Sequence, residues 1–381
     1  RIGDREAIGP LSRALVGSEK DKELSVRKVV AYSLGRTGDK EAMWPLSQAL
    51  ADRDEHIEVR DWAVKSLALV GGKEAIGNLS RALVGSEKDK AWGVRDLVAY
   101  SLGRIGDREA MWPLSQALAD RDEQIEVRVS AVLSLALVGG KEAIGNLSRA
   151  LVGSEKDKSG RVRDFVAYSL GRIGDREAIG PLSRALVGSE KDKSWRVLET
   201  VAYSLGRTGG KEACEVLRQA LGDADPDVYF PALNALHRIG GQEAIWALGR
   251  ALVGDGKVEK TKVRRLITER LGELGKINEK AAEEASAPLI KVLTDKSEDH
   301  RIQRIAVGAL IVIGGVAIEE LRQVFEELDS DVQKAASGIF DLPPVGLGSK
   351  FGESRRQAEA DNNGVHPMVF YALVLVLVAL A

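Results

Sequence analysis

A short word, Gly-x-x-Glu-Ala, recurs along most of this chain and limits what the chain can fold into. Successive copies are 35, 33, 35, 33, 35, 35 and 31 residues apart. A period in this range accommodates two helices and two turns, stacked so that each unit covers the apolar face of the next. The word begins at Gly3, Gly38, Gly71, Gly106, Gly139, Gly174, Gly209 and Gly240. The repeat therefore predicts a tandem array of helix pairs.

Each repeat contains two apolar stripes at helical spacing. In the first repeat, residues 6–15 predict a first helix and residues 26–37 a second one, with a polar loop between them. Gly38 then ends the unit, as glycine commonly does after a helix. About ten second helices can be counted, the last at residues 332–340. We therefore predict an all-α, right-handed α-solenoid (an armadillo-like superhelix) of about ten helix pairs over residues 1–342.

Composition narrows the functional classes. The net charge of −2 argues against a nucleic-acid binder, which carries basic patches. The one cysteine, Cys214, occupies the position of Ile8 and Ile76, so we expect a buried core residue. The chain begins inside a repeat, which suggests a fragment.

The composition changes after the repeats. Residues 343–367 are polar and punctuated by Gly and Pro, as in a flexible linker. Residues 368–381 are all apolar, but 14 residues are fewer than the roughly 20 that span a bilayer. We expect a truncated transmembrane helix and a chain associated with a membrane through its C-terminus, on a side that the sequence does not indicate. A core or docking helix is the alternative.

The repeat pattern resembles HEAT repeats, and more narrowly the HEAT-like repeats named after the phycobilisome lyases. The residues of one repeat that carry the resemblance are Asp54, Val59, Arg60, Ala63, Val64, Leu67, Gly71, Glu74 and Ala75. The resemblance implies a binding scaffold, because few members of this family act in catalysis. It also implies that Asp and Arg six residues apart form a ladder linking the repeats, in Asp21/Arg27, Asp54/Arg60, Asp89/Arg95, Asp122/Arg128 and Asp157/Arg163.

Enzymatic signatures are scarce. Deoxyhypusine hydroxylase, a HEAT-type enzyme, holds iron with repeated His-Glu pairs, and this sequence has no such pair. The four histidines are scattered, and no Gly-x-x-x-x-Gly-Lys-Ser/Thr phosphate loop occurs. We therefore expect no catalytic residue, no metal and no cofactor.

Two positions of the second helix fall opposite its buried stripe at 100° per residue. The seventh is Tyr32, Lys65, Tyr100, Leu133, Tyr168 and Tyr203, and the eleventh is Arg36, Leu69, Arg104, Leu137, Arg172 and Arg207. Second helices line the concave surface of HEAT-type arrays, and Tyr and Arg dominate interface hot spots. The alternative is ordinary exposed residues that recur because the repeats are duplicated.

The near-identical segments 38–90 and 106–158 differ mostly on this face. Asp61, Trp62 and Lys65 are replaced by Val129, Ser130 and Leu133. Val129 and Leu133 are predicted to form an exposed apolar patch. Trp44, Trp112 and Trp246 are expected to pack on the outer layer. The residues expected to bind a partner are Tyr32, Arg36, Trp62, Lys65, Tyr100, Arg104, Val129, Leu133, Tyr168, Arg172, Tyr203 and Arg207.

These observations favour a non-enzymatic scaffold that binds a protein partner on the concave face, tethered to a membrane and without affinity for nucleic acid. The alternatives are a bilin-lyase-like or other modification enzyme of the same family and a purely structural spacer.

Overall fold

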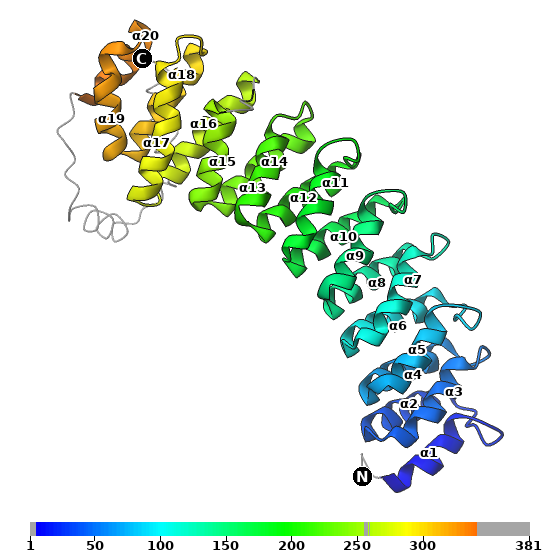
Figure 1. Cartoon of the computed structure of the whole chain (residues 1–381). Coiled ribbons are helices and arrows are strands. Elements are labelled where there is room, and N and C mark those ends of the chain that lie inside the picture. The colour runs from blue at the N-terminus through cyan, green and yellow to red at the C-terminus, as the bar shows by residue number, and fades with distance from the viewer. Residues whose placement is uncertain (1–4, 255–257, 259, 341–381) are drawn as a thin grey trace, which may run out of the picture. The chain divides into compact units, whose positions relative to one another are not determined.

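The structure, a computed structural model, describes residues 5–254, 258 and 260–340. These residues contain helices, turns and loops but no strand. They form two compact units that divide between Thr208 and Gly209. Figure 1 labels the helices of both units.

Unit 1 contains six helix pairs. Its first helices are α1 (Ile8–Leu15), α3 (Met43–Ala51), α5 (Gly72–Leu83), α7 (Met111–Ala119), α9 (Gly140–Leu151) and α11 (Ile179–Leu186). Its second helices are α2 (Leu24–Thr37), α4 (Ile57–Val70), α6 (Trp92–Ile105), α8 (Ile125–Val138), α10 (Gly160–Ile173) and α12 (Trp195–Thr208). Short 3₁₀ helices precede four first helices: η1 (Arg5–Ala7), η2 (Lys40–Ala42), η3 (Arg108–Ala110) and η4 (Arg176–Ala178).

Unit 2 contains four further pairs. They are α13 (Gly210–Leu221) with α14 (Pro226–Ile239), α15 (Gly241–Val253) with α16 (Thr261–Gly275), α17 (Glu279–Thr294) with α18 (His300–Ile313), and α19 (Val316–Val324) with α20 (Ser330–Phe340); η5 (Phe325–Glu327) lies before α20. The part of the chain that the structure describes thus holds ten helix pairs, which confirms the predicted all-α solenoid.

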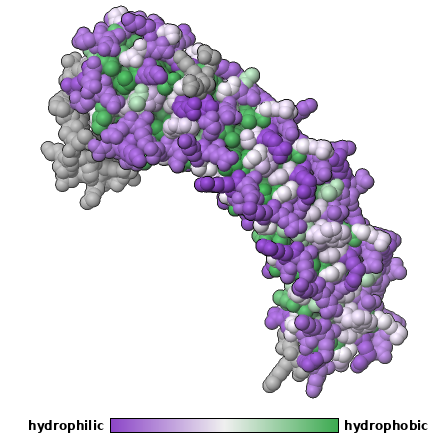
Figure 2. All heavy atoms as spheres, viewed as in Figure 1, coloured by the Kyte–Doolittle hydropathy of each residue, from purple (hydrophilic) through white to green (hydrophobic). Residues whose placement is uncertain are grey.

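Two layers build unit 1. Each second helix packs on the first helix of its own pair and on the neighbouring second helices, so that α2, α4, α6, α8, α10 and α12 form one layer. The first helices form the other. The core between the layers is aliphatic, and Leu34, Leu67 and Leu102 are fully buried. Figure 2 shows mostly hydrophilic residues on the visible surface, with small hydrophobic areas between them.

The near-identical segments 38–90 and 106–158 lie two repeats, or 68 residues, apart, and this two-repeat period reappears as an alternation in how tightly second helices pack. Gly35 on α2 lies against Ser66 on α4, and a Cβ at Gly35 would fall 2.4 Å from the Ser66 Cβ. The same contact joins Gly103 to Ser134. In the intervening repeats alanine takes the glycine position, as at Ala68, so the backbones cannot approach as closely.

The predicted ladder between repeats exists: two of its five pairs, Arg60–Asp89 and Arg128–Asp157, join residues that were both predicted, whereas the carboxylate of the other three pairs is Glu55, Glu123 or Asp192. Arg95 does not bind the carboxylate of Asp89; its Nη1 donates to the Asp89 carbonyl oxygen, while Nε and Nη2 donate to the carboxylate of Glu123 in the next repeat. Asp122, beside Glu123, is exposed. A guanidinium at the start of a second helix points forward along the array, so its carboxylate partner lies 28 or 29 residues later rather than six residues earlier.

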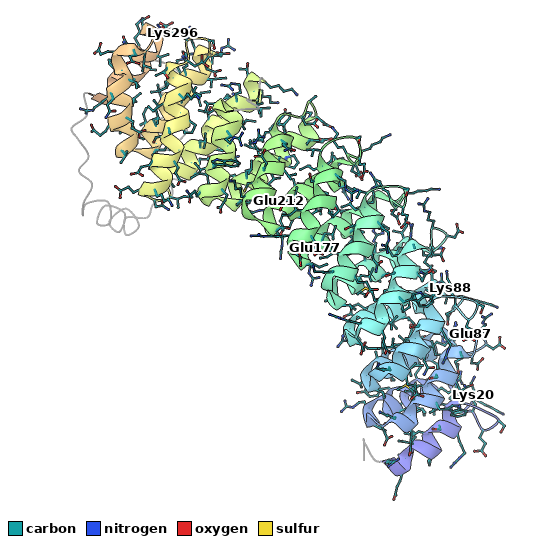
Figure 3. All side chains as sticks on the ribbon, in the orientation of Figure 1. Lys20, Glu87, Lys88, Glu177, Glu212 and Lys296 are labelled. Atoms are coloured by element: carbon teal, nitrogen blue, oxygen red, sulfur yellow. The ribbon has the colours of Figure 1, made fainter. Side chains whose placement is uncertain are left out.

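The ladder runs through unit 1 with one ion pair per repeat. Its members are Arg27–Glu55, Arg60–Asp89, Arg95–Glu123, Arg128–Asp157 and Arg163–Asp192. Loop lysines reinforce it, as where Lys88 Nζ lies 2.8 Å from Glu123 Oε2. Figure 3 labels Lys20, Glu87 and Lys88, which all come from inter-helix loops of this unit. Unit 2 has one such pair among its described residues, between Arg264 and Glu298.

The burial of Cys214 and the packing of the first-helix tryptophans were also predicted, and the structure confirms only the first. Cys214 is fully buried, as predicted. Trp44 and Trp112 do not pack into a layer as predicted; both are 62% exposed, because the part of the chain that the structure describes has no third layer over the outer side of the first helices. The linker at 343–367 and the apolar segment at 368–381 lie outside the described residues. In the described part of the chain, no helix has the length and apolarity needed to cross a membrane.

Candidate functional site

The candidate site is the outward side of the second-helix layer of unit 1, which we call the second-helix face. It is built from the seventh and eleventh positions of α2, α4, α6, α8, α10 and α12. Tyr32, Tyr100 and Tyr168 are 38%, 49% and 38% exposed. The arginines one turn later, Arg36, Arg104, Arg172 and Arg207, are also exposed, whereas Tyr203 is half-buried. The face therefore presents repeated Tyr and Arg side chains to solvent.

An aromatic and cationic cluster occupies the face at α2 and α4. The Tyr32 and Trp62 rings meet edge to face, with centroids 5.3 Å apart. Arg36 Nη1 donates to the Tyr32 hydroxyl at 3.0 Å, and Lys65 Nζ lies 4.7 Å from the Trp62 ring centroid. These contacts order four long side chains before any partner binds, which lowers the entropy lost on association.

Packing between second helices positions these residues. The Gly–Ser contacts hold α6 and α8, and likewise α10 and α12, close together at their C-terminal halves. The ion-pair ladder holds the N-terminal ends through the loops. The ladder recurs with every repeat and the Gly–Ser contact with every second repeat, so equivalent side chains form rows across the layer.

The predicted apolar patch is only partly present. Val129 is 92% buried and Leu133 is half-buried, so the prediction that both are exposed is wrong for Val129. The prediction took into account only burial against the first helix. A second helix inside the layer is also covered by the second helices on either side of it. Val129 occupies such a flank. The exposed leucines are instead at the eleventh position, where Leu69 and Leu137 are 64% and 48% exposed.

Acidic residues form another row on the same layer. Asp96 accepts a hydrogen bond from the Ser130 hydroxyl at 2.5 Å, and Asp164 one from Thr200 at 2.5 Å. Asp61 has the same position, but Leu97 replaces the hydroxyl side chain in the next repeat. Burial raises the pKa of Asp61, and the nearby Lys65 and Arg60 only partly offset that effect. These acidic side chains thus lie near the N-terminal ends of their second helices, whereas the arginines of the second-helix face lie near the C-terminal ends.

The ion pairs of the ladder lower the pKa values of two of its carboxylates, Glu123 and Asp192. Burial by itself would raise the pKa of Glu123, but hydrogen bonds from Arg95 and Lys88 outweigh burial and lower it to about 2. The pKa of Asp192 is lowered to about 2 in the same way, because hydrogen bonds from Arg163, the Ser194 amide and Lys156 outweigh burial. A carboxylate held ionised by buried partners is a poor general acid or base near neutral pH.

Two kinds of reactive site can be checked among the described residues, a metal cluster and a nucleophilic thiol. They contain no cluster of three or more His, Cys, Asp or Glu side chains that could hold a metal ion. Burial raises the pKa of the Cys214 thiol to about 11, which disfavours the nucleophilic thiolate. A surface cavity of about 570 Å³ between α7 and α9 belongs to the first-helix layer, and its lining includes Arg149 and Glu155 but no residue of the second-helix face.

Comparison with solved structures supports the repeat fold. The chain is similar to Kap121p bound to Nup53p, with 13% identity, a TM-score of 0.52, and coverage of 87% of this chain and 40% of that one. It thus spans well under half of Kap121p. Human deoxyhypusine hydroxylase shows 22% identity over 78% of this chain and 94% of its own, with a TM-score of 0.32. The CpcE–CpcF complex of phycocyanin lyase from a Nostoc species shows 19% identity over 68% and 94%, with a TM-score of 0.34.

No curated protein matches the sequence. The family model described as HEAT repeats matches three overlapping stretches, residues 44–125, 112–193 and 186–261, which together cover more than half of the chain. This match agrees with the helix pairs and their stacking, so the chain belongs to the HEAT repeat family.

Proposed function

We propose that this protein is a non-enzymatic scaffold that binds a protein partner on the second-helix face of unit 1. One observation carries the proposal: four second helices present an exposed arginine one turn after a tyrosine, at Tyr32/Arg36, Tyr100/Arg104, Tyr168/Arg172 and Tyr203/Arg207. Tyr and Arg contribute disproportionately to binding energy in interfaces. Kap121p, which shares the fold, has been solved with bound proteins such as Nup53p.

A pull-down with a quadruple variant tests the proposal. Tyr100→Ala/Arg104→Ala/Tyr168→Ala/Arg172→Ala removes two of the four Tyr/Arg pairs of the face, and we expect it to recover at least tenfold less partner than wild type. A matched control removes first-helix-layer side chains instead, in Arg81→Ala/Arg149→Ala, and should recover wild-type amounts. Equal recovery by wild type and the quadruple variant would place the binding site elsewhere.

We also propose that residues 368–381 tether the scaffold to a membrane. The support is the all-apolar composition of this segment after a polar linker. Full-length protein and a form ending at Leu342 should be fractionated side by side. We expect the full-length chain in the membrane fraction and the shortened one in the soluble fraction; if both remain soluble, the segment is better interpreted as a docking helix.

A further inference from the structure

The eleventh position of the second helices forms a row in which positive and apolar side chains alternate over the first five helices, from α2 to α10, and α12 adds a further arginine. In chain order this arginine–leucine row is Arg36, Leu69, Arg104, Leu137, Arg172 and Arg207. All six side chains are exposed. Two large exposed leucines between arginines are unusual for a surface that only solvent touches, so the row has the composition of a binding surface.

The arginines of the row carry uncompensated charge. In the described part of the chain, no carboxylate lies within ion-pair distance of Arg104, Arg172 or Arg207, and Arg36 bonds only the Tyr32 hydroxyl. Arginines on the first-helix layer behave differently, because Arg13, Arg81 and Arg149 each pair with a glutamate of the following loop. The row therefore offers guanidinium groups that a partner's carboxylates can bind.

The spacing of the row selects the conformation of its occupant. Neighbouring packed helices lie about 8–10 Å apart, so Leu137 is about one such step from Arg104 and Arg172 is about two. A polyproline II helix advances about 9.3 Å per turn of three residues, which returns every third side chain to the same side. A β-strand would turn every third side chain to the opposite face. The row thus matches a polyproline II segment.

The tyrosines beside the row fit the same ligand. Tyr100 and Tyr168 lie one helical turn before Arg104 and Arg172 and are partly exposed. Aromatic side chains that line a groove are the usual platform for polyproline II segments.

We infer that the partner of this face is an extended protein segment of polyproline II type, with acidic, apolar and acidic side chains at every third position. Its carboxylates bind Arg104 and Arg172, and its apolar side chain packs on Leu137. This inference rests on the proposed scaffold function and specifies its ligand.

Charge on the face distinguishes this ligand from single-stranded nucleic acid, which Tyr and Arg can also bind. Asp61, Asp96, Asp164 and Glu199 occupy equivalent positions on four second helices of the same layer. This acidic row would repel a chain that carries phosphate on every residue. A segment with one carboxylate per two repeats can place its charges on the arginines alone.

Fluorescence anisotropy with full-length protein and labelled peptides tests the inference. The matched peptide carries Asp, Leu and Asp at its first, fourth and seventh positions in a proline background. A reordered peptide has the same composition with these residues at the first, third and fifth positions. We expect the matched peptide to bind about tenfold more tightly, and its affinity to fall as salt is added.

The chain itself supplies conservative variants. Arg104→Leu/Arg172→Leu introduces the residue that Leu69 and Leu137 already place at this helix position, so the fold should be kept. We expect this variant to lose about tenfold in affinity for the matched peptide. Leu137→Arg should shift the preference at the fourth peptide position from Leu to Asp. Arg81→Leu/Arg149→Leu removes two paired arginines of the other layer and should bind as wild type.

Equal affinity for the matched and reordered peptides would overturn the inference, as would tighter binding of oligo-deoxythymidine than of the matched peptide. If only the inference about the peptide is wrong, the quadruple variant described above will still lose its partner in the pull-down. If that pull-down is also unaffected, the proposed function itself fails.

Discussion

Arg95 on α6 and Glu123 before α8 form a buried, two-pronged ion pair between neighbouring repeats. Arg95 Nε donates to Glu123 Oε2 at 2.8 Å, and Nη2 donates to Oε1 at 2.6 Å. The two side chains are 9% and 1% exposed. A third donor of Arg95, Nη1, bonds the Asp89 carbonyl oxygen of its own loop. One guanidinium therefore closes a loop and joins two repeats.

Removing this arginine should destabilise unit 1. Arg95→Leu leaves the buried Glu123 carboxylate with Lys88 as its remaining cation, and we expect a loss of about 3 kcal/mol in the free energy of unfolding. Urea unfolding followed by circular dichroism measures the loss. Arg81→Leu, which removes an exposed arginine 3.6 Å from Glu87, should change the value by less than about 0.5 kcal/mol. Similar losses for the two variants would contradict the structural role of the ladder.

The ladder should also make stability depend on acid pH. The pKa of Glu123 is lowered from 4.5 to about 2 in the folded chain, so this group stabilises the fold above its unfolded pKa. The contribution is lost as pH falls from about 4.5 towards 2. Glu123→Gln removes this titrating group. We expect the variant to be less stable than wild type at pH 7, and the difference in the free energy of unfolding to shrink steadily as pH falls from about 4.5 towards 2. A deficit that stays constant down to pH 2 would show that the Glu123 charge is not coupled to folding.

Two glycine-to-alanine substitutions should act in opposite directions. Gly103 lies inside α6, and a Cβ there would fall 2.4 Å from Ser134 Cβ and 2.6 Å from its Cα. Gly103→Ala should therefore cost about 1–3 kcal/mol through overpacking. Gly145 lies inside α9 with nothing within 4 Å of its Cβ position, so Gly145→Ala should stabilise by about 0.5–1 kcal/mol. Thermal unfolding distinguishes these outcomes, and equal signs would contradict the packing described.

Cys214 should be inert in the folded protein. The thiol is fully buried on α13, and burial raises its pKa to about 11, with a further contribution from the negative charge of Glu243. We expect negligible reaction with a disulfide reagent at pH 8 and rapid reaction in denaturant. Rapid labelling without denaturant would show that this part of unit 2 opens readily.

The fold class, the number of helix pairs and the burial of Cys214 could all be predicted from the amino-acid sequence. These follow from local signals: apolar spacing within a helix, a turn glycine after it, and repetition of both. The repeat also located the exposed tyrosines and arginines, because residues opposite the stripe that faces the first helix remain outside.

The contacts between repeats, in contrast, could not be predicted from one helix at a time. Val129 is 92% buried although it lies outside the stripe that faces the first helix, and Arg95 binds the carboxylate of Glu123 rather than the carboxylate of Asp89. Trp44 stays exposed because no layer among the described residues covers it. Helical periodicity gives the angle of a side chain around the axis of its own helix. The contacts between repeats depend instead on how closely and in which direction the next helix packs. That information lies in pairs of residues about 30 positions apart, such as Gly103 and Ser134, and becomes visible only when the helices are assembled.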